Sequence, residues 1–393
     1  MTTTRRSVLG LLGASGALLA TGAVAGAATD SATSVDVRAF DRFVREQAAE
    51  DAFSGSLLLV HRGRPVLARS YGRANDTAPN GPDTLFAMAS VTKLFTAVAI
   101  AQLAQAGKIA YTSTLGTFLS GFPAEVADTV QVHHLLTHTS GFGDTFTMPG
   151  YLEEALTWTD ADRVMTGTTD YIRRTSPEFA PGAGSRYSNA AYHLLGAIVA
   201  QVSGKSYYDY VRAHVFRPAG MTTTDFYTRP QWHTDPRIAH PYAKQPTGGR
   251  ADTIDQRLYV GTPAGDAFTT CADMANFAAA LQGAKLLDRA FTGITLNGKV
   301  PPPPPPGPPP PGGTPGAPHA AFQCYGPVTL LVGDQWVTGH GGGAPGTSTD
   351  FQMYPDTGWV TVILSNYDYD GGPPPVVKKA RDIITARPGA VMR

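Results

Sequence analysis

Strand-forming segments lie near the two ends of this chain, and helical patterns fill the middle. Residues 55–60 and 65–68 are apolar runs separated by His61-Arg62-Gly63-Arg64, which predicts a β-hairpin. Towards the other end, short apolar runs with Gly and Asp turns between them predict successive strands at residues 328–332, 335–338, 348–354 and 359–364. The simplest arrangement pairs both ends in one antiparallel sheet, with a helical domain inserted between them.

The helical patterns are easiest to read where apolar residues share one side. Val37, Phe40, Phe43 and Val44 lie on one side of the predicted helix at residues 35–50. Gly107 fits the end of the alanine-rich helix that starts near Ser90. The segments predicted to be helical are residues 35–50, 90–106, 132–141, 191–202, 273–281 and 375–386. Residues 229–260 show little periodicity and are expected to form an extended surface excursion.

These patterns predict an α+β fold of the α/β sandwich type, in which helices flank a central antiparallel sheet. We expect a discontinuous sheet domain of residues 36–90 and 322–390 and a mostly helical domain of residues 91–290. Residues 300–320 contain a run of prolines that cannot form a helix or a central strand. A solvated loop is the expectation there, and a ligand for a proline-reading module is the alternative.

The N-terminal segment reads as an export signal. Thr4-Arg5-Arg6-Ser7-Val8-Leu9 precedes an apolar run at residues 11–24, and Ala25-Gly26-Ala27 offers a small-residue cleavage site. The paired arginines favour the twin-arginine route, with an ordinary secretory signal as the alternative. We therefore expect residues 1–27 to be a signal peptide. The mature protein is expected to be secreted or extracytoplasmic, with no stable membrane anchor, because the apolar run is short and rich in Gly and Ala.

Charge and cysteine content narrow the choice of partners. The 393 residues include 31 Lys and Arg and 31 Asp and Glu, and no basic stripe occurs, so no nucleic-acid partner is expected. The two cysteines, Cys271 and Cys324, would meet an oxidising environment after export. Their sequence positions do not show that they are close, so a disulfide stays open. We expect a monomer.

Ser90-Val91-Thr92-Lys93 places a hydroxyl and an amine three residues apart at the head of an apolar helix. Residues at that spacing lie on one helical face, so the two groups can meet. Ser90 is then a candidate nucleophile and a partly desolvated Lys93 a candidate base. Unpaired N–H groups at the helix start also favour a developing oxyanion. A capping serine beside a surface lysine is the alternative, but the neighbouring Leu94 and Phe95 imply a buried helix.

Two further motifs carry side chains that suit acyl transfer. Tyr187-Ser188-Asn189 is the only Tyr-x-Asn in the chain. A tyrosine hydroxyl beside a lysine can shuttle protons, and an asparagine amide can orient the lysine and a substrate amide together. Gly339-His340-Gly341-Gly342-Gly343 follows the strand at residues 335–338 and is expected to close it. Its glycines let the backbone approach a ligand and can supply a second oxyanion N–H.

These three elements, in this order, resemble the serine β-lactamase and penicillin-binding-protein superfamily. The resemblance is to the branch that holds class C β-lactamases, D-alanyl-D-alanine carboxypeptidases, D-aminopeptidases and related esterases. His134-Leu135-Leu136-Thr137-His138-Thr139-Ser140-Gly141 and the stretches at residues 181–196, 265–277 and 346–366 also match. The similarity covers roughly residues 36–290 and 322–386.

The resemblance implies a role for each matching residue. Ser90 would be acylated, Lys93 would take its proton, and Tyr187 would pass protons to the leaving group or activate water. Asn189 would position Lys93 and the substrate. The N–H groups of Ser90 and Gly343 would form the oxyanion hole, with Gly341 and His340 beside the substrate.

His340 departs from the family pattern, because many members carry lysine there. A histidine with an unperturbed pKa near 6.5 is a cation only part of the time at neutral pH. This departure argues against efficient β-lactamase activity and favours peptidase or esterase activity.

A metal or cofactor site is not expected. His134 and His138 have a zinc-compatible spacing, but residue 135 is Leu and no third ligand is evident, so we expect them to hold a loop. The leading hypothesis is an exported serine hydrolase of the D-alanyl-D-alanine carboxypeptidase type. Its substrate would be a D-Ala-D-Ala peptide, an ester or a β-lactam, so an esterase and a weak β-lactamase stay open. The alternative of another class is a non-catalytic cell-wall-binding protein.

Overall fold

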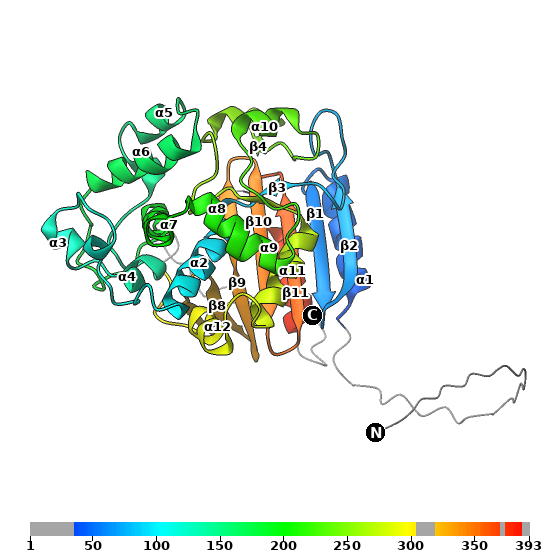
Figure 1. The fold of residues 1–393 in the computed structure, drawn as a ribbon. Helices are drawn as coiled ribbons and strands as arrows, with labels where there is room; N and C mark the ends of the chain where they lie inside the picture. The colour runs from blue at the N-terminus through cyan, green and yellow to red at the C-terminus, as the bar shows by residue number, and fades with distance from the viewer. Residues whose placement is uncertain (1–34, 304–318, 370–373, 387–393) are drawn as a thin grey trace, which may run out of the picture. The chain divides into compact units, whose positions relative to one another are not determined.

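A seven-stranded antiparallel sheet joins segments from the two ends of the chain, seen in Figure 1 as blue strands beside orange ones. The computed structural model describes residues 35–303, 319–369 and 374–386. The strands are β1 (Gly55–His61), β2 (Arg64–Tyr71), β7 (Ala320–Gln323), β8 (Val328–Val332), β9 (Gln335–Ala344), β10 (Thr347–Tyr354) and β11 (Trp359–Ser365). Their order is β2-β1-β11-β10-β9-β8-β7, and β1 pairs with β11 from Gly55↔Ser365 to His61↔Trp359. The predicted fold class is confirmed.

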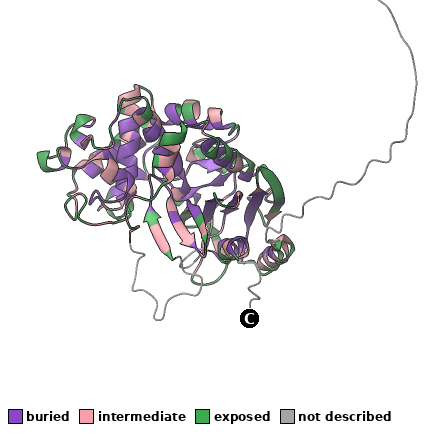
Figure 2. Ribbon diagram, turned by 90° about the horizontal axis from the view of Figure 1, so that it is seen from below, coloured by how far each residue is buried: buried purple, intermediate pink, exposed green. Residues whose placement is uncertain are grey.

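The apolar runs form this sheet because helices cover both of its faces. Along β1, Leu57 and Leu59 pack into one core and Leu58 packs into the other, as the alternation of side chains requires. Helices α1 (Val37–Ala49) and α13 (Pro375–Thr385) cover the first face, and their apolar sides share its core. Figure 2 shows the consequence: the central strands are buried, whereas the outer faces of the helices are exposed.

Helix α2 (Lys93–Gln105) lies in the larger core on the opposite face of the sheet. Residues on all sides of α2 are buried, which explains why its sequence is apolar all round. Gly107, with a φ of 70°, follows its C-terminal end as predicted. The neighbours of α2 in this layer include α7 (Asn189–Ser203), α11 (Cys271–Gln282) and α12 (Arg289–Leu296).

Apart from one helix of 13 residues, the remaining α-helices and β-strands of the described residues are short. They are α3 (Ala124–Ala127), α4 (Val132–Leu136), α5 (Tyr151–Ala155), α6 (Ala161–Arg173), α8 (Tyr207–Val211), α9 (Arg217–Ala219), α10 (Arg229–Thr234), β3 (Phe86–Ala87), β4 (Tyr242–Lys244), β5 (Arg250–Asp252) and β6 (Phe268–Thr269). The expected excursion at residues 229–260 therefore contains a helix and a hairpin, whose elements are too short to give a periodic pattern. From Val35 onward the chain forms one compact unit, so its division into a sheet domain and a helical domain stays a prediction.

The structure corrects the predicted end of one strand. The run from Gly339 to Gly343 does not close β9, because β9 continues through it to Ala344 and pairs with β10 along that length. A side chain at Gly339 would overlap the carbonyl of Phe351, so glycine permits close pairing here. Strand β8, by contrast, pairs with β9 only as far as Gly339. The far part of β9 therefore has an edge that β8 does not cover.

The structure bears on whether the two cysteines form a disulfide and on whether a described helix could span a membrane. Cys271 and Cys324 are both buried and both free, so they form no disulfide. Among the residues that the structure describes, no helix is both long and apolar enough to span a membrane. The proposed signal peptide and residues 304–318 of the proline-rich stretch lie outside the described residues.

Candidate active site

Ser90 lies in a 3₁₀ turn, Ala89–Thr92, and not in the helix itself, which begins at Lys93. The helix expected to start at Ser90 starts at Lys93 instead, because residues 89–92 form a tighter 3₁₀ turn. Ala89, at the start of this turn, adopts a left-handed φ of 45°. The turn is held by the neighbouring loop: Met88 donates to the carbonyl of Ala267 at 2.8 Å, and Asp266 donates to that of Ala89 at 3.2 Å. Such backbone strain persists where surrounding contacts over-determine it.

Lys93 is buried, with no measurable exposure, and its ammonium lies at the centre of the site. The Nζ atom donates to Ser90 Oγ at 3.2 Å, to Asn189 Oδ1 at 2.7 Å and to the carbonyl of Ala264 at 2.6 Å. It also lies 4.8 Å from the centre of the Tyr187 ring. Three segments far apart in the sequence, around residues 90, 187–189 and 264, therefore converge on one amine.

Burial lowers the pKa of Lys93 to about 7, against the pull of the Asp144 and Asp266 charges, which raise it. At neutral pH a substantial fraction of the amine is therefore unprotonated. Such an amine can accept the proton of Ser90, whose side chain is only partly buried and remains open to a ligand.

Tyr187 and Asn189 reach the site because Ser188 anchors the start of α7. The Ser188 hydroxyl accepts from the N–H of Ala191 at 2.9 Å and donates to the carbonyl of Gly143 at 2.9 Å. Ser188 is fully buried, whereas Tyr187 is 37% exposed. Desolvation raises the pKa of the Tyr187 phenol, and its hydrogen bond with Ser90 lowers it.

The two histidines considered for zinc make backbone contacts instead. His134 Nδ1 accepts from the N–H of Gln131 at 3.1 Å, and His138 Nδ1 accepts from that of Ser188 at 3.1 Å. The His138 ring also lies 4.6 Å from that of Tyr187, so His138 supports the Tyr-x-Asn segment. Within residues 35–303, 319–369 and 374–386, no three potential ligands gather in a group able to hold a metal.

Asp144 is a site residue that sequence reasoning missed. Its Oδ1 accepts from Asn189 Nδ2 at 2.9 Å, which directs the Asn189 carbonyl oxygen towards Lys93. The same carboxylate accepts from the N–H of Phe146 at 3.1 Å. An isolated aspartate in a loop carries no recognisable pattern, so the sequence offered no signal for it.

The glycine run places β9 directly against the turn that carries Ser90. A Cβ atom at Gly342 would overlap the carbonyl of Met88 and the hydroxyl of Thr349, and would lie 3.1 Å from the N–H nitrogen of Ser90. Gly343 follows on the same strand and lines the same cavity as Ser90. Gly342 is thus the residue whose lack of a side chain brings the strand to Ser90, a role that the sequence did not single out.

His340 and Gly341 line a different hollow from Ser90. Tyr187 lines the hollow of His340 and forms a hydrogen bond with Ser90. The rings of His340 and Tyr187 lie 6.3 Å apart. Burial and the charge of Lys93 lower the pKa of His340 to about 4. The imidazole is therefore neutral at pH 7, so it offers a substrate carboxylate even less positive charge than the unperturbed pKa suggested.

Ser90 opens into a cavity of about 390 Å³. Its lining combines the polar groups of Ser90, Asp144 and Asn189 with a mainly apolar wall. That wall includes Phe146, Leu152, Tyr227, Trp232, Leu258, Val260 and Phe268. The guanidinium of Arg257 also lines it, but this group lies 3.3 Å from the carboxylate of Asp266 and donates to Thr347. An activated hydroxyl at the edge of a mainly apolar cavity suits attack on a carbonyl carbon.

Comparisons with known proteins agree with this geometry. The chain is 31% identical to the putative penicillin-binding protein PbpX of Bacillus subtilis over 60% of its own length and 57% of that protein's. It is 33% identical to the esterase EstB of Burkholderia gladioli, covering 48% and 50% of the two chains. It is 29% identical to a putative D-alanyl-D-alanine carboxypeptidase of Escherichia coli O157:H7, covering 47% and 46%.

A solved structure extends the likeness to most of the fold. A penicillin-binding protein from Bacillus halodurans superposes with a TM-score of 0.72 at 26% identity, over 86% of this chain and 97% of that one. The chain spans about half the length of the curated relatives that it matches. The family model described as Beta-lactamase matches residues 40–385. This chain therefore belongs to the Beta-lactamase family, which includes penicillin-binding proteins and serine hydrolases.

Proposed function

We propose that this protein is a serine hydrolase that works through a covalent acyl-enzyme on Ser90, with a D-alanyl-D-alanine carboxypeptidase-like activity. The observation that carries the proposal is the buried amine of Lys93, which lies 3.2 Å from Ser90 Oγ with a pKa of about 7. A non-catalytic wall-binding protein would gain nothing from burying a lysine in this state.

In the proposed mechanism, neutral Lys93 accepts the proton of Ser90 as Oγ attacks the substrate carbonyl. The N–H groups of Ser90 and Gly343 stabilise the oxyanion. Tyr187 passes a proton to the leaving amine or alcohol, and the carbon–nitrogen or carbon–oxygen bond breaks. Water then attacks the acyl carbon and gives a proton to the same Lys93–Tyr187 pair. The bond between the acyl carbon and Ser90 Oγ breaks, and Oγ takes that proton back as the acid leaves.

The uncovered edge of β9 supports a peptide substrate. Because β8 stops opposite Gly339, the backbone from His340 to Ala344 can pair with an extended peptide on that side. The similarity to a putative D-alanyl-D-alanine carboxypeptidase points the same way.

An esterase is the second candidate. Neutral His340 offers no ion pair to a C-terminal carboxylate, and the cavity beside Ser90 is mainly apolar, which suits an uncharged acyl group. The similarity to the esterase EstB also supports this alternative.

Labelling first tests whether Ser90 is acylated, which both the carboxypeptidase and the esterase proposals require. A fluorescent penicillin or a fluorophosphonate, followed by mass spectrometry, should give an adduct on Ser90 that is absent from Ser90→Ala and kept by Ser120→Ala, a change at an exposed serine. The absence of any adduct on Ser90 from either reagent would refute the enzyme proposal. Turnover of a D-Ala-D-Ala peptide, a p-nitrophenyl ester and a cephalosporin would then rank the three activities.

We also propose export by the twin-arginine route, supported by Arg5-Arg6 and the apolar run at residues 11–24. Replacing both arginines by lysine should stop export. Undiminished export of that variant would instead indicate the ordinary secretory route.

A further inference from the structure

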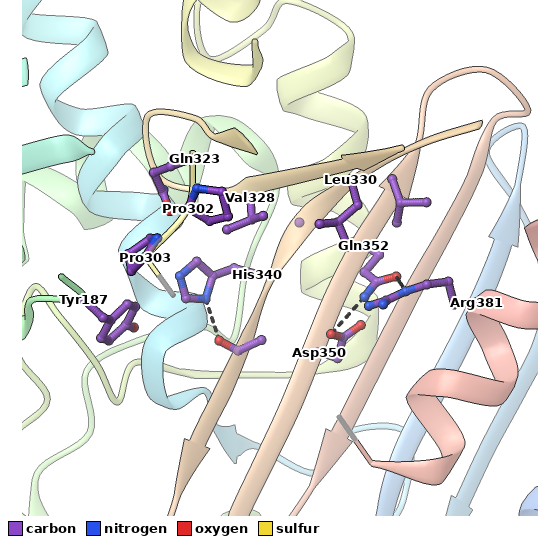
Figure 3. Close-up of a pocket in the computed structure, with 13 residues that line it drawn as sticks. Tyr187, Pro302, Pro303, Gln323, Val328, Leu330, His340, Asp350, Gln352 and Arg381 are labelled. Atoms are coloured by element: carbon purple, nitrogen blue, oxygen red, sulfur yellow. Dashed lines mark hydrogen bonds between the residues drawn. The ribbon is translucent and has the colours of Figure 1, made fainter. Parts of the chain in front are cut away.

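A second hollow, of about 340 Å³, lies against the sheet next to the catalytic residues (Figure 3). Tyr187, His340 and two prolines, Pro302 and Pro303, border it at one end. Its apolar wall comes from β8 and β9, through Val328, Leu330 and Val337. The side chains of Asp350, Gln352 and Arg381 lie at the other end, and the proposed acyl-transfer mechanism uses none of these three.

The hollow reaches a buried carboxyl because the strand beside that carboxyl carries glycines. Gly341 of β9 pairs with Asp350 of β10, and Gly339 pairs with Gln352. Neither glycine has a side chain to cover its neighbour, and a Cβ atom at Gly341 would lie 3.8 Å from Asp350 Oδ2. Asp350 and Gln352 thereby line the hollow although they are only 6% and 5% exposed.

An amide holds two opposite charges apart at this end, as Figure 3 shows. Gln352 Nε2 donates to Asp350 Oδ2 at 3.1 Å, and Gln352 Oε1 accepts from Arg381 Nε at 3.2 Å. Among the described residues, no ion pair joins Arg381 to an acidic group, and no acceptor is found for its terminal nitrogens. Within the described part of the chain, the Oδ1 atom of Asp350 is buried and has no hydrogen-bond partner.

An unpaired carboxyl oxygen in this position is costly for the protein by itself. Burial raises the pKa of Asp350 to about 7, although the charge of Arg381 lowers it. A buried acceptor left without a donor loses the full solvation of that atom. A ligand that donated to Oδ1 would remove this cost, and one that also accepted from Arg381 would neutralise both charges.

We propose that this hollow binds a small zwitterion of the amino-acid class, with its ammonium on Asp350, its carboxylate on Arg381 and its apolar side chain against Val328, Leu330 and Val337. The two protein charges are opposite, close and separated by one amide, which matches a ligand that carries both signs on one short scaffold. This inference does not depend on the reactivity of Ser90.

Calorimetric titration of the Ser90→Ala protein tests it without interference from turnover. The probes are D- and L-leucine, leucinamide, which has only the ammonium, and N-acetylleucine, which has only the carboxylate. At least one leucine enantiomer should bind about tenfold or more tightly than both single-charge probes, the factor expected for one lost ion pair. Absence of binding by both enantiomers at about 10 mM, or equal binding of either single-charge probe, would overturn the proposal.

Matched variants locate the site. In the same background, Asp350→Asn and Arg381→Gln should each weaken leucine binding about tenfold. Asp334→Asn, in the exposed turn before β9, and Lys378→Gln, exposed on α13, should leave it unchanged. Binding that survives both test variants would show that the zwitterion sits elsewhere, which would also refute the assignment. Because these measurements use no acylation, they fail or succeed separately from the proposed hydrolase activity.

Discussion

Replacing Asp144 by asparagine should move the pH profile of acylation without dismantling the site. Asparagine keeps an oxygen that can accept from Asn189 Nδ2, so the contact from Asn189 to Lys93 is preserved. Only the negative charge disappears. Because that charge raises the pKa of Lys93, its removal should lower the pKa below about 7.

The size of the shift follows from the geometry. Contacts of 2.7 Å from Lys93 to Asn189 and 2.9 Å from Asn189 to Asp144 bracket one amide group. They place the two charges about 7 Å apart, which corresponds to about 0.6 kcal/mol in water and about 2.4 kcal/mol at an effective dielectric constant of about 20. At about 1.4 kcal/mol per pKa unit, the rise of the acylation rate with pH should move down by about 0.4 to 1.7 pH units.

The assay is acylation by a neutral ester such as p-nitrophenyl acetate, followed as kcat/KM or as a burst between pH 5.5 and 9. The rate should rise through the pKa of Lys93, because the proposed mechanism uses the unprotonated amine as the base. His340, with a pKa of about 4, and Tyr187, whose pKa is raised, do not titrate in this range. Asp83→Asn, at an exposed position, is the control. An unmoved profile, or one displaced to higher pH, would refute the assignment of Lys93 as the base.

Three more changes test other contacts. Gly342→Ala should cut acylation about 100-fold while the protein stays folded, because the new methyl group pushes β9 away from the Ser90 turn. Gly293→Ala is the control, and full activity of Gly342→Ala would contradict this packing. Asp350→Asn should raise the melting temperature by an amount that grows from about pH 4 to about pH 7 and then levels off. The carboxyl ionises at its usual pKa of 3.8 in the unfolded chain but only near 7 in the folded protein, so the wild type loses up to about 4 kcal/mol of stability between these pH values. A difference in melting temperature that does not depend on pH would count against this. His340→Lys should change the preference between a carboxylate-terminated peptide and an ester more than it changes acylation by a reactive ester, and equal losses on all substrates would disprove this.

Structural features that are set by residues close together in the sequence were predictable from it. The hairpin of β1 and β2, the helices α1, α2, α7, α11 and α13, and the turn of Gly107 follow from apolar periodicity and glycine positions. The meeting of Ser90 and Lys93 follows from their spacing, which survives although Ser90 lies in a 3₁₀ turn and not in the helix. Pairing of the two chain ends was predictable because apolar runs on both sides of a helical stretch leave few other ways to bury them.

Contacts between distant segments were not predictable in the same way. Nothing near Asp144 in the sequence marks it as a partner of Asn189, and nothing near Gly342 shows that Met88 will lie against it. The continuation of β9 through four glycines, which usually weaken strands, depends on β10 being close enough to pair with them.

The sequence by itself determined which groups this protein has for chemistry and their local spacing: a serine, a lysine, a tyrosine, an asparagine and a glycine-rich segment. Only the tertiary structure decided their charge states, since the pKa of Lys93, His340 and Asp350 depends on desolvation and on charges from other segments. The physical reason is that short-range geometry is set by neighbours along the chain, whereas the cost of removing a charge from water is set by everything that folds around it.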